Sequence, residues 1–104
     1  MKKIKFYDKV FDAEVEVFLD KTEDRKHSGE TMNVDRINKD GSVYKEYRVC
    51  LEDKKDFYTL LHETVHLVEK IFTDRGIPFT SENSEIIAYY QTYWFKQIWR
   101  KINK

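Results

Sequence analysis

The sequence predicts one α+β domain in which a small antiparallel sheet of three to four strands is followed by two helices. Three observations lead to this fold class: apolar and polar residues alternate through much of residues 1–52, apolar residues recur at helical spacing in residues 53–104, and a glycine–proline break divides that second half at Gly76–Pro78. A chain of 104 residues has the size of a single domain. We therefore expect residues 1–104 to form one unit, with a sheet half (1–52) and a two-helix half (53–104).

The sheet half contains one strong strand pattern and two or three weaker ones. Ala13, Val15, Val17 and Leu19 alternate with Glu14, Glu16 and Phe18, which is typical of a half-buried strand. Residues 3–7, 31–37 and 47–51 alternate less regularly. Residues 38–42 contain an Asp-Gly pair, which is a hairpin signal, so we expect the last two strands to pair antiparallel.

The helical half has clear start and stop signals. Asp53 is a suitable N-cap for a helix that runs to about Arg75, where a glycine and then a proline end it. Thr80 or Ser81 caps the second helix, whose apolar residues recur every three or four positions. These residues are Ile87, Tyr90, Trp94, Ile98 and Ile102.

The composition argues against several classes of protein. Lys plus Arg and Asp plus Glu number 19 each, so no excess charge favours nucleic acid or an anionic membrane as a partner. No apolar run approaches the about 20 residues of a membrane span. Cys50 is the only cysteine, which excludes an internal disulfide and a thiolate metal cluster. The basic start of the chain is interrupted by Asp8 before any apolar stretch of signal-peptide length, so we expect a cytoplasmic protein.

The first helix carries the pattern HExxH, as His62-Glu63-Thr64-Val65-His66. Residues four apart on a helix lie one turn above each other and about 40° apart, so both imidazoles can reach one ion. Zinc accepts two neutral nitrogens and a carboxylate and keeps a fourth position for water. The pattern predicts Zn²⁺ as cofactor, His62 and His66 as ligands, and Glu63 as the general base that takes a proton from the attacking water.

A carboxylate on the second helix is the expected third ligand. If the apolar stripe of that helix is centred near Trp94 and Ile98, Glu85 borders the stripe and Glu82 lies nearly opposite it. This favours Glu85 over Glu82. Glu69 shares the histidine face but would strain a tetrahedral site, and we interpret it as an ion-pair or outer-shell partner.

The remaining histidine and two tyrosines of the second helix are further candidates for the site. His27 stands in the charged segment 21–28 and is interpreted as a solvated side chain. Tyr89, one turn after Glu85, is the favoured donor to the oxyanion of peptide hydrolysis, ahead of Tyr93. The apolar face of the first helix is expected at Phe57, Leu61, Val65, Val68 and Phe72, with the second helix covering the histidine face.

These residues resemble a known family. The chain resembles the small zincin-like metallopeptidases encoded by phages and prophages in three places: Leu60-Leu61 before the HETVH pattern, the turn at residues 76–78, and the segment Glu82-Asn83-Ser84-Glu85-Ile86-Ile87-Ala88. The resemblance covers about residues 57–95. It implies a minimal zincin-like fold, the ligands and base named above, and a sheet edge at about residues 42–51 that pairs with an extended peptide. A phage origin would place the protein in the cytoplasm of a bacterial host.

The sequence thus favours a zinc-dependent metallopeptidase that hydrolyses a peptide or protein substrate. One alternative is a non-catalytic, zinc-stabilised protein-binding module of phage or bacterial origin. A second alternative is that no metal binds and that the histidines belong to a polar helix face.

Overall fold

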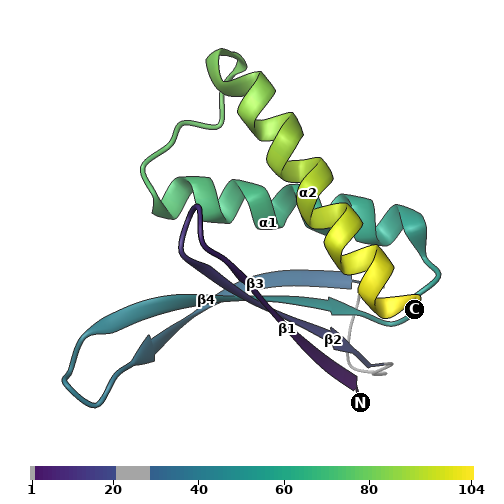
Figure 1. The fold of residues 1–104 in the computed structure, drawn as a ribbon, viewed down its shortest axis with the longest axis horizontal. Coiled ribbons are helices and arrows are strands. Elements are labelled where there is room, and N and C mark those ends of the chain that lie inside the picture. The colour runs from purple at the N-terminus through teal and green to yellow at the C-terminus, as the bar shows by residue number, and fades with distance from the viewer. Residues whose placement is uncertain (1, 21–28) are drawn as a thin grey trace.

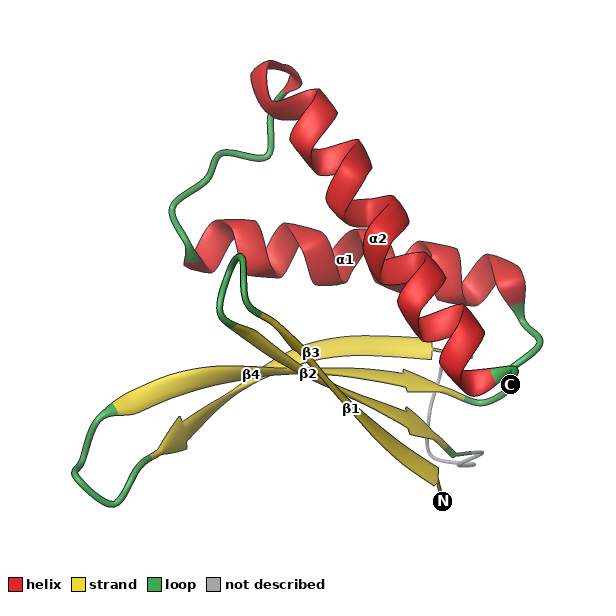
Figure 2. Cartoon of the chain, viewed as in Figure 1, coloured by secondary structure: helices red, strands yellow, loops and turns green. Residues whose placement is uncertain are grey.

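The structure is a computed structural model, and it describes residues 2–20 and 29–104. Four strands are followed by two helices: β1 (Lys2–Asp8), β2 (Ala13–Leu19), β3 (Gly29–Ile37), β4 (Val43–Leu51), α1 (Phe57–Asp74) and α2 (Ser84–Ile102), with a short 3₁₀ turn, η1 (Ser81–Asn83), before α2. Both helices cover the same face of the sheet, and α2 crosses over α1 (Figures 1 and 2). The predicted α+β class is confirmed.

The strand order is β1-β2-β4-β3, and one pair of neighbours differs from the expected antiparallel arrangement. β1 with β2 and β3 with β4 are antiparallel, but β2 and β4 run parallel, so the sheet is mixed. The reason lies in the side chains that face the helices. On β4 these are Tyr47, Val49 and Leu51, all buried, whereas β3 offers Thr31 and Asn33, so the more apolar β4 takes the central place.

This order also corrects the expected peptide-binding edge. Most of this segment is β4, whose residues 46–51 pair with β2 on one side and β3 on the other and so have no open edge; residues 43–45 pair with β3 alone. β3 is the sheet edge next to α1.

The hairpin and helix-stop signals are confirmed. Gly41 has φ 89° in the β3–β4 turn, where the Asn38 N–H donates to the Ser42 carbonyl at 2.8 Å. At the end of α1, Gly76 has φ 72° and the Ile77 N–H donates to the Phe72 carbonyl at 2.9 Å, which is a Schellman cap. The N-cap of α1 is Asp56 rather than Asp53, and its carboxylate accepts from the Thr59 N–H at 3.1 Å.

The core lies between the sheet and the helices. Trp94 of α2 is buried against Phe6 of β1, with the two ring centroids 6.0 Å apart. Tyr90, one turn earlier, donates a short hydrogen bond to the buried carboxylate of Asp8. Burial is the larger cause, and this hydrogen bond the next, of the raised pKa of the Tyr90 phenol. These contacts hold α2 on the β1 side of the sheet, whereas α1 lies beside β3.

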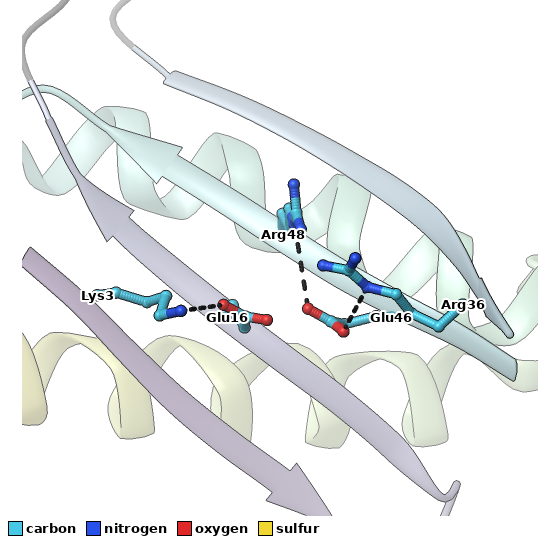
Figure 3. Close-up of polar contacts among 5 residues, drawn as sticks. All are labelled: Lys3, Glu16, Arg36, Glu46 and Arg48. Carbon is cyan, nitrogen blue, oxygen red and sulfur yellow. Dashed lines mark hydrogen bonds and ion pairs between the residues drawn. The ribbon is translucent and has the colours of Figure 1, made fainter. Parts of the chain in front are cut away.

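The other face of the sheet carries a polar network instead of a second layer (Figure 3). Lys3 and Glu16 lie 3.6 Å apart, and Glu46 accepts from Arg36 at 3.1 Å and lies 4.0 Å from Arg48. The hydrogen bond with Glu16, together with Arg36, holds the pKa of Glu46 below its ordinary value against the opposing effect of burial. Helices therefore pack on one face only.

Candidate metal centre

His62 and His66 lie on the side of α1 that faces away from the core. The buried face of α1 consists of Leu60, Glu63, Thr64, Leu67, Val68, Ile71 and Phe72. The expected apolar face was therefore partly wrong: Val68 and Phe72 are buried, but Phe57, Leu61 and Val65 are exposed. These three residues form the flank toward α2, where the Gln91 side chain donates to the Leu61 carbonyl at 3.4 Å. Because α2 occupies this flank, it leaves the histidines exposed instead of covering them.

The two imidazoles meet as the HExxH spacing predicts. Their Nε2 atoms are 3.2 Å apart, and the ring centroids are separated by 4.8 Å. At this separation one neutral imidazole can donate to the other, which keeps both Nε2 atoms together on the outer side of the helix.

A cavity of about 660 Å³ joins the histidines to the start of the edge strand. Its walls come from two elements, the first three residues of β3 and one side of α1. The residues that line it are Gly29, Glu30, Thr31, Tyr58, Thr59, His62, Glu63, His66 and Lys70.

Glu63 is held between the two elements that form the cavity. Glu63 is only 6% exposed. The Thr31 hydroxyl lies 2.6 Å from Glu63 Oε1 and 3.1 Å from the backbone carbonyl of the same residue. A buried carboxylate is stable only with a hydrogen-bond donor, and Thr31 is that donor.

Gly29 allows β3 to approach this close. A Cβ atom at Gly29 would stand 2.5 Å from Thr59 Cγ2 and 3.0 Å from Glu63 Cγ. The first distance is shorter than carbon atoms tolerate and the second is tight, so a larger residue here requires Thr59, Glu63 or the edge strand to shift. Gly29 and Thr31 thus set the position of Glu63 from the sheet side.

The predicted carboxylate ligands lie apart from the histidines. Glu85 is exposed in the first turn of α2, and neither it nor Glu82 lines the cavity. Glu69 is exposed on α1 and is also outside the lining. Within the described ranges, no group of three or more His, Cys, Asp or Glu side chains is placed to hold a metal ion. His27 falls outside the described residues.

The predicted tyrosine also lies elsewhere. Tyr89 is 78% exposed and borders a separate apolar surface with Val10, Ile86 and Tyr93. The tyrosine that lines the histidine cavity is Tyr58, four residues before His62. Its spacing was visible in the sequence, as was that of Lys70, four residues after His66. Gly29 and Thr31 gave no such signal, because only the folded structure brings β3 to α1.

Comparisons with known proteins leave the site to be interpreted from its own geometry. No protein-family model, no curated protein and no solved structure matches the chain. In the described ranges, neither helix is both long and apolar enough to cross a membrane.

Proposed function

We propose that the protein binds one Zn²⁺ ion through His62 and His66 and hydrolyses peptide bonds, with Glu63 as general base. The observation that carries the proposal is the 3.2 Å separation of the two Nε2 atoms. With Zn–N distances of about 2.0–2.1 Å and tetrahedral angles, two histidine ligands have nitrogens about 3.3–3.4 Å apart. The separation of the two Nε2 atoms is therefore close to the one that two zinc ligands need.

The third ligand is part of the proposal as well. Two histidines fill half of a tetrahedral site, and a carboxylate plus a water suit the remaining positions. Glu85 is the carboxylate that we propose, and its exposure at the start of α2 leaves its side chain free to reorient. Glu85 does not line the cavity, so the first turn of α2 would have to move toward the histidines to bring it in.

The residues of the cavity supply the proton transfers. A zinc ion held there would polarise the substrate carbonyl and lower the pKa of water toward about 7. Glu63 accepts one proton from the water while the water oxygen attacks the carbonyl carbon of the substrate. Glu63 then gives that proton to the leaving amine as the C–N bond breaks. Thr31 orients the carboxylate by donating to Oε1 at 2.6 Å. The edge strand β3, which begins at the cavity, offers backbone groups for an extended peptide.

The decisive experiment compares Glu63→Gln with the wild type on a broad peptide library after zinc loading. Glu69→Gln is the matched control, because Glu69 is an exposed glutamate on the same helix. We expect the wild type and Glu69→Gln to cleave the same peptides, and Glu63→Gln to keep the metal and the fold but lose cleavage by at least about a thousandfold. Cleavage that persists in Glu63→Gln would contradict the proposed role.

A zinc-stabilised binding module is the second candidate, favoured by the apolar surface around Tyr89. Val10 is 80% exposed and Tyr89 78% exposed, which is unusual for large apolar groups that lie side by side. If the protein is a binding module, the wild type, Glu63→Gln and Glu69→Gln all bind zinc and none of them cleaves a peptide. We further propose the cytoplasm as the location, since a chain with one cysteine has no internal disulfide to maintain.

A further inference from the structure

Lys70 differs from the other lysines that the structure describes. All of those are exposed, whereas Lys70 is partly buried and lines the histidine cavity. A lysine ammonium group pairs with anionic groups through charge-assisted hydrogen bonds. In residues 2–20 and 29–104, the ion pairs involve Lys3, Arg36, Lys45 and Arg48, and none involves Lys70.

Lys70 continues a row of side chains along one ridge of α1. Tyr58, His62, His66 and Lys70 are spaced four residues apart, and all four line the same cavity. Each step along such a ridge advances about 6 Å and turns about 40°. The histidines therefore stand in the middle of the cavity wall, with a phenol at one end and an ammonium group at the other.

The acidic groups of the cavity leave the ammonium available. Glu63 is engaged by Thr31 at 2.6 Å, and in the proposed function it is the base. Glu30, the other carboxylate of the lining, is on β3 and exposed to water. Neither forms an ion pair with Lys70 within the described residues.

We propose that Lys70 binds a carboxylate of the substrate near the scissile bond. The inference rests on the proposed function, because it takes the histidine pair as the place where the bond is cut. Lys70 follows His66 by one helical turn and lines the same cavity, so its ammonium group can form a charge-assisted hydrogen bond with a carboxylate of a peptide bound at the histidines. The carboxylate is that of the peptide C-terminus or of an acidic side chain.

The test measures binding and does not depend on cleavage. Three capped dipeptides serve as probes: N-acetyl-Ala-Ala with a free C-terminus, the same dipeptide as its amide, and N-acetyl-Ala-Asp amide. Each is titrated by NMR into the wild type, Lys70→Met, Lys70→Arg and Lys96→Met, with and without zinc. Lys96 is an exposed lysine of α2 outside the cavity and provides the matched control.

We expect the wild type and Lys96→Met to bind at least one of the two carboxylate probes about tenfold more tightly than the neutral amide. Lys70→Met should remove this preference and Lys70→Arg should retain most of it. Tighter binding of the free C-terminus identifies the terminal carboxylate as the ligand, and tighter binding of the aspartate probe identifies the side chain. Equal affinity for all three probes, or no binding of any, overturns the proposal. If the wild type binds no zinc but still prefers the carboxylate probes in a way that depends on Lys70, the proposed function is rejected and carboxylate binding by Lys70 is not.

Discussion

Single residues decide whether the HExxH pattern on α1 can work as a site. Thr31 is the clearest case, because its hydroxyl lies 2.6 Å from Glu63 Oε1 across the boundary between sheet and helix. Glu63 is buried, and this donor fixes the orientation of its carboxylate. The proposed base is thus oriented by the sheet, although it belongs to the helix.

Replacing Thr31 tests this arrangement. Thr31→Val keeps the shape of the side chain and removes the donor, so we expect kcat to fall by about tenfold or more with little change in KM. Thr31→Ser restores the hydroxyl and should recover most of the rate. Both variants should bind zinc as the wild type does, because Thr31 does not contact the histidines. An equal loss of rate in the valine and serine variants would argue against the orienting role.

At the scale of elements, polar contacts fix the C-terminal end of α1. The last turn has no basic residue and contains Asp74, an unfavourable charge for a helix C-terminus. Three partners compensate for it. Tyr47 donates to Asp74 Oδ2 at 2.6 Å, Lys45 donates to Oδ1 at 3.1 Å, and Asn33 adds a further hydrogen bond.

The Asp74 contacts predict how stability depends on pH. Burial opposes ionisation of Asp74, but the bonds from Tyr47, Lys45 and Asn33 outweigh it and lower the pKa below the ordinary value. Because the folded-state pKa is depressed, the stabilisation is complete above the unfolded pKa of about 3.9 and is lost as the pH falls through the folded pKa. We expect Asp74→Asn to lower the free energy of unfolding by about 2 kcal/mol at pH 7 and by much less near pH 2. Urea unfolding at both pH values measures the difference, and a constant deficit would contradict the assignment to this carboxylate.

The position of α2 determines whether the third ligand comes from Glu85. The sequence argument favours Glu85 over Glu82, and both are exposed near the start of α2. We expect Glu85→Gln to weaken zinc binding by at least about tenfold, because one anionic ligand is lost, while Glu82→Gln leaves it nearly unchanged. Competition with a chromogenic chelator gives both affinities. If the two variants bind alike, the third ligand does not come from this turn.

The sequence predicts which segments form strands and helices better than it predicts which of these elements lie next to one another. The four strands, two helices and two glycine turns follow from local patterns, and so does the meeting of His62 and His66. The parallel pairing of β2 with β4 and the edge position of β3 did not, because they depend on which strand buries the more apolar face. For the same reason the contribution of Thr31 could not be found from its place in the chain, 32 positions from Glu63.

At the scale of the whole molecule, the proposed metal would connect the first turn of α2 with the face of α1 that bears the histidines. α2 is anchored to β1 at Tyr90 and Trp94, while its first turn and the face of α1 that bears the histidines are exposed. A zinc ion held by His62, His66 and Glu85 would tie these two regions together. Metal binding should therefore stabilise the folded state as a whole and not only the site.

Thermal unfolding measures that coupling. A ligand at about 100 times its Kd stabilises the folded state by about 2.7 kcal/mol, and for a domain near 100 residues this raises the Tm by about 10–20 °C. We expect zinc to produce such a shift in the wild type and EDTA to reverse it. His62→Ala and His66→Ala should melt at the metal-free temperature whether or not zinc is added, because each retains only one imidazole of the pair. His27→Ala is the matched control at the remaining histidine of the chain and should respond to zinc as the wild type does. A wild-type Tm that neither zinc nor EDTA changes would mean that the histidines do not hold a metal in the folded protein, and the proposed chemistry would fail with them.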